Sequence, residues 1–322
     1  MTFARFPALS RRQLLAGLGA ATLGYGGPPG LLRAMADTSA RRPAGVVSAL
    51  AFDRGTLVLA AEGLWRSEDG GASFAPLSDG PGAPVSALAT HPDLAGVIYA
   101  TTASAGLQRS QDAGLTWAPA GPGLPSAPMD AVAIAAQDPQ LIYVAVRGDG
   151  LWQSKDGAQT WEFAMDRPLM DKVEVDVQVL ASVGSLSGMG GYWVYAGTAK
   201  GASRVPDCFC RWSSLDSAGA MAVSDSTAKP VQVDPALRLP DVSVTSLALA
   251  PSVPEVLFAG LPSGIWKSAD TGATWALASG ELASPQLAVN PLDPNHVVAA
   301  AAGGTMLSSR DGGVTWSAPA AV

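Results

Sequence analysis

The chain has 322 residues, of which 48 % are hydrophobic and only 15 % are charged, and it contains 36 Gly and 25 Pro residues. This composition favours many short strands joined by tight turns, and a closed all-β fold of this length is often a single domain. Four of the 20 basic residues lie within the first 36, which leaves 16 against 27 acidic residues, a balance that repels nucleic-acid phosphates.

The first 36 residues have the organisation of an export signal. A basic start is followed by a mildly apolar stretch rich in Gly and Ala, and then by Ala-Met-Ala at 34–36. The pair Arg11-Arg12 resembles the twin-arginine signal, although an ordinary secretory signal with a chance Arg-Arg pair is the alternative. We therefore expect a signal peptide at 1–36, a short linker at 37–45 and a mature chain that is periplasmic or otherwise exported. No apolar stretch reaches the roughly 20 residues of a membrane span, so we expect no transmembrane segment.

A repeated eight-residue segment follows the leader and predicts the fold. We call its copies boxes 1 to 6; they are SEDGGASF at 67–74, SQDAGLTW at 110–117, SKDGAQTW at 154–161, VPDCFCRW at 205–212, SADTGATW at 268–275 and SRDGGVTW at 309–316. Their aspartates are 43, 44, 51, 63 and 41 residues apart, and three strand-like stretches precede each box while one follows it. This period is typical of four-stranded propeller blades.

The sequence therefore predicts an all-β fold, a single β-propeller over 46–322 with four-stranded antiparallel blades. Six boxes predict six blades. The long stretch at about 213–241 is rich in Ser, Ala and Asp, which favours an inserted loop. A degenerate seventh hairpin within this insertion is the alternative.

The residue types of the boxes suit a turn between the third and fourth strands of a blade. Asp accepts hydrogen bonds from turn amides, Ser and Thr hydroxyls join that network, and Gly permits a positive φ. The aromatic residue at the eighth position begins the outer strand and packs between blades. We expect structural and not catalytic roles for Asp69, Asp112, Asp156, Asp207, Asp270, Asp311, Trp117, Trp161, Trp212, Trp275 and Trp316.

Candidate recognition residues fall in loops that the topology places on one face of the ring. Links between second and third strands share this face with the links between blades, and loops on a rigid scaffold commonly carry binding sites. Met165, Leu169 and Met170 stand among charges there as a candidate apolar contact, since Met adapts to varied partners. The alternative is that these loops only fold over the channel mouth. The partner-binding candidates are Arg147, Asp149, Arg167, Met170, Lys172 and Lys200.

Box 4 departs from the pattern. Val205, Phe209 and Arg211 stand where the other boxes favour Ser, Gly and Thr, and Cys208 and Cys210 are the only cysteines of the chain. Three interpretations stay open in an oxidising compartment: a strained, redox-active disulfide, a thiolate pair that binds Cu(I) with a third ligand, or a local pair without a role. No other cofactor is expected.

The boxes resemble the Asp-box, S-x-D-x-G-x-T-W, which is found in sialidases and in many other propellers, and the resemblance covers nearly the whole mature chain. A sialidase would imply a Phe/Tyr-Arg-Ile-Pro string, three spaced arginines and a Tyr nucleophile with a Glu partner. No such string occurs, and Arg66 and Arg109 directly precede a box while Arg310 lies inside one, so they belong to the repeat. The style of the blades, with GLWxSxDGGxTW-like boxes, is closer to non-catalytic propellers similar to the photosystem II stability and assembly factor.

This resemblance implies a non-enzymatic scaffold that holds a periplasmic or membrane-bound protein or complex, and no catalytic residue is predicted. The alternative is a secreted carbohydrate-active hydrolase or a glycan-binding propeller. For that alternative, Asp149, Asp166, Asp171 and Glu174 are the carboxylates that could converge across the loops.

Overall fold

The computed structural model describes residues 43, 45–77, 80–186, 191–215 and 234–320, all within the unit Ala40–Val322. The expected signal peptide at 1–36, nearly all of the linker and residues 216–233 of the expected insertion lie outside the described residues. Within the described ranges, no helix is long and apolar enough to cross a membrane.

Within the described ranges, the strands form six antiparallel blade sheets and one two-stranded sheet, and each sheet pairs its strands in chain order. Blades 1 and 2 consist of β1 (Ala49–Asp53), β2 (Thr56–Ala61), β3 (Gly63–Ser67) and β4 (Ala75–Pro76), then β5 (Val85–Thr90), β6 (Ile98–Thr102), β7 (Leu107–Ser110) and β8 (Ala118–Pro119). Blade 3 consists of β9 (Met129–Ala135), β10 (Asp138–Val146), β11 (Gly150–Ser154) and β12 (Glu162–Met165). A separate two-stranded sheet follows, formed by β13 (Leu169–Met170) and β14 (Val173–Glu174).

Blades 4 to 6 repeat the arrangement after this small sheet. Blade 4 consists of β15 (Val177–Leu186), β16 (Tyr192–Thr198), β17 (Gly201–Pro206) and β18 (Ser213–Ser214), and a 3-10 helix η1 (Pro235–Leu237) precedes blade 5. Blade 5 consists of β19 (Ser246–Leu249), β20 (Leu257–Leu261), β21 (Gly264–Ser268) and β22 (Ala276–Ser279). Blade 6 has β23 (Gln286–Asn290), β24 (Asp293–Ala300) and β25 (Met306–Ser309), with a single bridge between Ser308 and Ser317 in the place of a fourth strand.

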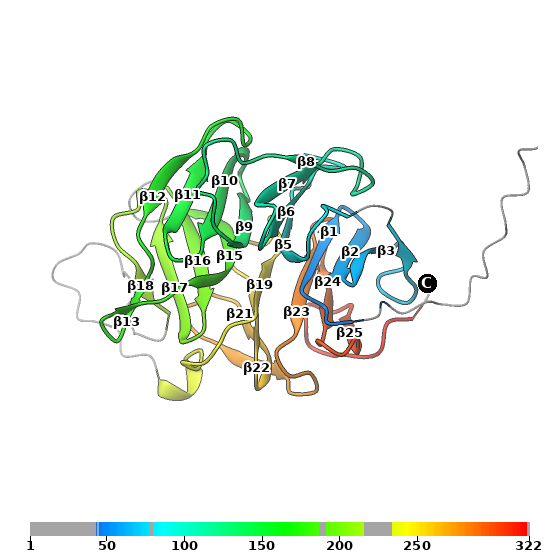
Figure 1. Ribbon diagram of the computed structural model, residues 1–322. Coiled ribbons are helices and arrows are strands. Elements are labelled where there is room, and N and C mark those ends of the chain that lie inside the picture. Colours follow the sequence, from blue (N-terminus) through cyan, green and yellow to red (C-terminus); the bar gives the residue numbers. More distant parts are fainter. Residues whose placement is uncertain (1–42, 44, 78–79, 187–190, 216–233, 321–322) are drawn as a thin grey trace, which may run out of the picture. The chain divides into compact units, whose positions relative to one another are not determined.

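The first strands of the blades close a ring around the axis. Each of β1, β5, β9, β15 and β19 contacts the first strand of the next blade, and β23 contacts β1 (Figure 1). The prediction of a six-bladed propeller is therefore confirmed. Blades 1 and 6 meet by packing, without a strand exchanged between them, as the order of strands in the repeat predicts.

The core lies between the blades. The described residues contain six clusters of buried apolar side chains, and each cluster joins two neighbouring blades. In one of them, for example, Tyr99 of blade 2 packs with Ile142 and Val144 of blade 3. Because both faces of a blade are covered by neighbours, the inner strands are apolar on both sides, which explains sequences such as MDAVAIA in β9.

Five of the six boxes close their turns by one hydrogen-bond network. The serine at the first position donates to the box aspartate, which also accepts the backbone amide and the hydroxyl of the seventh residue. In box 3, Ser154 Oγ lies 2.8 Å from Asp156 Oδ1, and the amide of Thr160 lies 2.9 Å from that oxygen. The fourth and fifth residues of these five boxes both have positive φ, at 69° and 71° in Gly157 and Ala158.

Candidate functional site

The six candidate residues lie in three loops of blades 3 and 4, on the face that holds the links between second and third strands. We call this the loop face, and the opposite face, which holds the box turns, the box face. Arg147 and Asp149 lie between β10 and β11, and Lys200 lies between β16 and β17. Arg167, Met170 and Lys172 lie in the segment that connects blade 3 to blade 4.

Two contacts join these loops. The backbone amide of Gly148 donates to Asp176 Oδ1 over 2.8 Å, and Thr198 Oγ1 lies 3.2 Å from the sulfur of Met170. The structure therefore brings together residues that lie far apart in the sequence.

The centre of this surface is the hairpin β13–β14. Its connecting residues Asp171 and Lys172 have φ angles of 52° and 64°. Two successive left-handed residues are the requirement of a type I′ hairpin turn, which fits the right-handed twist of two paired strands. The turn places Lys172 at the exposed tip, between Leu169 and Val173 on the two strands.

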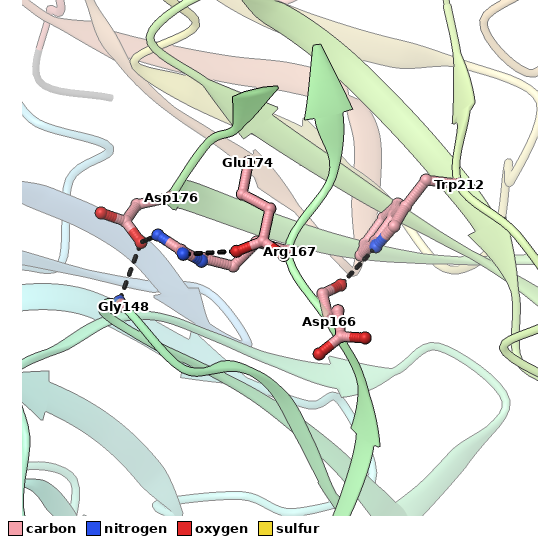
Figure 2. Close-up of polar contacts among 6 residues, drawn as sticks. All are labelled: Gly148, Asp166, Arg167, Glu174, Asp176 and Trp212. Carbon is pink, nitrogen blue, oxygen red and sulfur yellow. Dashed lines mark hydrogen bonds and ion pairs between the residues drawn. The ribbon is translucent and has the colours of Figure 1, made fainter. Parts of the chain in front are cut away.

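Arg167 anchors the base of the hairpin. Its guanidinium pairs with Glu174, and it also donates to Asp176 Oδ1 over 3.1 Å (Figure 2). Its hydrogen bonds to Asp176 and then to Glu174 raise the pKa of Arg167. Because Asp176 also accepts the amide of Gly148, one carboxylate ties the hairpin to the loop of blade 3. The hairpin is therefore bound to the propeller at its base.

Trp212 holds the segment from the other side. The indole Nε1 of this box tryptophan donates to the backbone oxygen of Asp166 over 2.8 Å (Figure 2). The side chain packs partly buried against the core between blades 3 and 4. Box 4 thus contributes to the position of the candidate site.

Two of the predicted polar residues are bound within the chain. Arg147 forms a two-point pair with Asp130, in which Nε lies 2.9 Å from Oδ2, and Asp149 accepts the indole Nε1 of Trp152 over 2.6 Å. Among the described residues, Lys172 and Lys200 make no ion pair. These two ammonium groups are exposed and are not engaged with a carboxylate in the described parts of the chain.

The most exposed apolar side chains of this region are Leu169 and Val173, with 68 % and 55 % of their surfaces accessible. Val173 was not among the sequence candidates, nor were the partners Asp130, Asp176 and Trp212. The alternation of LMDKVE at 169–174 could have suggested a hairpin, but the pairing of Arg167 with Glu174 and Asp176 depends on how the turn folds.

Two of the four carboxylates named for a glycosidase are engaged within the chain. Asp149 binds Trp152 and Glu174 pairs with Arg167, while Asp171 occupies the exposed hairpin turn. Two cavities along the inner strands have volumes of about 150 Å³ each. Pockets for small-molecule ligands are usually about 300–1,000 Å³, so these cavities are too small for a sugar chain.

Larger hollows lie on the loop face of blades 1 to 3. They have volumes of about 530 and 730 Å³, and they are lined mostly by Ala, Gly, Pro and Leu, with Glu62 as the one charged residue. Such walls offer few side-chain hydrogen bonds to a carbohydrate.

Cys208 and Cys210 form a disulfide within box 4. The bonded pair has no thiolate to offer, so the Cu(I) interpretation applies only to the reduced pair and stays a prediction. Within the described residues, no group of three or more His, Cys, Asp or Glu side chains could hold a metal ion.

No protein-family model matches the chain, and no curated protein matches it. Solved structures do match. A protein of unknown function from Bacteroides thetaiotaomicron is 9 % identical over 82 % of this chain and 69 % of its own, with a TM-score of 0.59. The GH74 xyloglucanase from Xanthomonas campestris is 21 % identical over 83 % of this chain and 45 % of its own, with a TM-score of 0.51.

YCF48 bound to a D1 peptide is 16 % identical over 85 % of this chain and 81 % of its own, with a TM-score of 0.47. The chain spans less than half the length of the GH74 structures that it matches. What is shared is the propeller fold. At these identities the matched proteins' activities do not carry over, because a propeller hosts many functions and the site decides among them.

Proposed function

We propose that this chain is an exported, non-enzymatic binding propeller that holds a protein partner on the loop face of blades 3 and 4. The observation that carries the proposal is the hairpin β13–β14, which is fixed by Arg167 at its base and exposes Leu169 and Val173. Scattered exposed apolar residues are ordinary, but here two stand on one fixed projection, on opposite sides of the hairpin, since Leu169 pairs with Glu174 and Val173 with Met170.

The energetics of the hairpin suit a binding site. Covering exposed apolar surface contributes about 25 cal/mol per Å², and the gain is realised most fully when the binding element is already ordered. The two ion pairs of Arg167 and the link from Asp176 to Gly148 supply that order before binding. Leu169 and Val173, on the two sides of the hairpin, would each contribute an apolar contact, with charged groups at the rim of the interface.

The charges indicate the chemistry of the partner surface. Lys172 at the hairpin tip and Lys200 in the adjacent loop are exposed, while Arg147 and Arg167 are paired within the chain. A partner surface with an apolar patch bordered by carboxylates would complement this arrangement. A periplasmic or membrane-bound protein is the class of partner that the export signal favours.

Export by the twin-arginine route is part of the proposal. It rests on the Arg11-Arg12 pair and the weakly apolar stretch behind it. Replacing both arginines with lysine, Arg11→Lys and Arg12→Lys, should retain the protein in the cytoplasm. Unchanged export of this variant would indicate the general secretory route.

Partner capture tests the binding proposal. The tagged protein is cross-linked in its native cells, and captured proteins are compared among the wild type, a Leu169→Asp/Val173→Asp variant and a Val314→Asp control. Val314 is 73 % exposed, but it lies in box 6 on the box face. A partner that is lost with the hairpin variant and kept with the control supports the proposal.

Loss of the partner in both variants would place binding elsewhere, and retention in both would exclude the hairpin. The glycosidase alternative is tested separately with an oligosaccharide panel. Hydrolysis that persists in the hairpin variant would show an activity independent of this surface.

A further inference from the structure

Box 4 has a different backbone from the other five boxes. In those five, the fourth and fifth residues both have positive φ; Ala113 and Thr271 show that a residue with a side chain can hold the fourth position. In box 4 only the fifth residue, Phe209, is left-handed, at 52°. Cys208, at the fourth position, is not, and its sulfur is bonded to Cys210.

The carbonyl of the fourth box residue has a recurring partner on the preceding blade. Gly157 O in box 3 accepts the hydroxyl of Tyr99 over 3.2 Å, and Thr271 O in box 5 accepts the hydroxyl of Tyr195 over 2.5 Å. The equivalent carbonyl in box 4 belongs to Cys208. Its expected donor is the tyrosine that the strand register aligns with these two.

That donor is Tyr143, which pairs with Gln153 across β10 and β11 just as Tyr99 pairs with Arg109. The side chain of Tyr143 is fully buried, and its hydroxyl has no hydrogen-bond partner within the described parts of the chain. Burial, and then the nearby Asp207, raise the pKa of Tyr143, so that the hydroxyl keeps its proton. A buried hydroxyl without a hydrogen-bond partner lowers the stability of the folded state, and such groups are rare in folded proteins. The unpaired hydroxyl of Tyr143 therefore calls for an explanation.

The disulfide constrains the turn in which the Cys208 carbonyl lies. It closes the turn across Phe209, whose ring packs edge-to-face on Tyr143 with the ring centroids 6.0 Å apart. Both cysteines are exposed, so a thiolate can reach either sulfur. Val205 and Arg211 cannot supply the hydroxyls that brace the other boxes, which leaves the disulfide as the covalent closure of this turn.

We propose that Cys208–Cys210 is a redox-active pair that exchanges with a protein dithiol, and that its reduction lets the Cys208 carbonyl accept the Tyr143 hydroxyl. A thiolate of the reductant attacks one sulfur, the S–S bond breaks, and the released thiolate takes up a proton. The second thiol of the reductant then attacks the mixed disulfide and releases the other cysteine of the pair, whose thiolate also takes up a proton. Two electrons and two protons pass to Cys208 and Cys210, and the reductant leaves as a disulfide.

The test is the position of the thiol–disulfide equilibrium. The folded protein is equilibrated with mixtures of reduced and oxidised dithiothreitol and then alkylated, and the reduced fraction is measured by mass spectrometry. Tyr143→Phe removes the hydrogen bond of the reduced form and the buried hydroxyl of the oxidised form. It should shift the equilibrium toward the disulfide by about three- to tenfold.

Tyr99→Phe is the matched control, because its bond to Gly157 is formed whatever the state of box 4. Equal equilibrium constants for the wild type and Tyr143→Phe would overturn the link to Tyr143. A disulfide that stays unreactive until the protein unfolds would overturn exchange itself. A second measurement uses the variant Cys208→Ser/Cys210→Ser, in which the turn cannot form the disulfide. In this background Tyr143→Phe should lower the urea midpoint of unfolding. In the oxidised protein with its disulfide, Tyr143→Phe should not lower it.

Discussion

Tyr99 of blade 2 donates its phenolic hydroxyl to the backbone oxygen of Gly157, in the box turn of blade 3, over 3.2 Å. Tyr195 makes the same bond from blade 4 to box 5, and Lys267 Nζ reaches the equivalent oxygen of box 6 over 2.7 Å. Neighbouring blades are therefore joined by a recurring polar bond at the box face, in addition to the apolar clusters between them.

Removing one of these bonds should cost a measurable part of the stability. Tyr99→Phe leaves the ring in place but leaves Gly157 O without this donor, so we expect a loss of about 0.5–1.5 kcal/mol in the free energy of unfolding. Urea unfolding followed by tryptophan fluorescence measures it. Tyr143→Phe serves as the comparison in the oxidised protein, where its hydroxyl has no partner among the described residues. Equal losses in the two variants would contradict this assignment.

The box aspartates should make the protein sensitive to strong acid. Hydrogen bonds from the hydroxyl and the backbone amide of Thr116 lower the pKa of Asp112 to about 2, and Thr160 acts in the same way on Asp156. Because the folded pKa lies below the unfolded value of 3.8, the stabilisation is complete above that value and is lost as the pH falls toward 2.

The double variant Asp112→Asn/Asp156→Asn separates this contribution from other effects of acid. It should be less stable than the wild type at pH 5, and the difference between their urea midpoints should shrink between pH 4 and pH 2. A difference that stays constant over this range would show that the two carboxylates do not titrate as described.

The blades could be predicted from the sequence because the residue types of a box are required by contacts within that same box. A turn that requires Ser, Asp, Gly and Thr at fixed positions repeats the pattern in five boxes, with Asp and Trp kept in box 4, and the spacing gives the length of a blade. The closure of β23 against β1 followed from the order of strands within the repeat. Even the departure at box 4 was visible as a loss of these residue types.

The site was less predictable because its contacts join distant residues. The pairing of Arg147 with Asp130 and of Arg167 with Asp176 depends on strand register and on the hairpin turn. The sequence placed these arginines on the correct face but could not show that their charges are bound within the chain. His296 lies within β24, which begins at Asp293, and its imidazole is buried in the core.

His296 should give the protein a second, milder range of acid sensitivity. The side chain is only 2 % exposed and meets the ring of Phe52 edge-on, with the centroids 5.2 Å apart. Burial, and then the charge of Arg310, lower the pKa of His296 from 6.5 to about 4. The unfolded chain therefore takes up a proton more readily than the folded protein, and stability should fall as the pH decreases from about 6.5 to about 4.

A His296→Gln variant tests this directly. Its urea midpoint should be lower than that of the wild type at pH 7.5, but it should change less between pH 6.5 and pH 4. The same slope in both proteins would mean that some other group titrates in this range.

The order of the loop-face hairpin should depend on Arg167. Arg167→Gln removes the pairs with Glu174 and Asp176, which weakens the attachment of β13–β14 at its base. The amide of Val175 donates to Pro168 O over 3.0 Å at the base of the hairpin, and the amide of Gly148 donates to Asp176. Both amides should exchange with deuterium faster in the variant, because local opening becomes easier.

Lys155→Gln is the matched control for this change. It removes the ion pair with Glu162, in which both side chains are largely exposed, and such pairs contribute about 0–1 kcal/mol. Amide exchange of the hairpin should be the same as in the wild type. If Arg167→Gln also weakens capture of the partner while Lys155→Gln does not, the ordered hairpin is required for binding. Normal capture by a hairpin that exchanges faster would show instead that the partner itself orders the hairpin on binding.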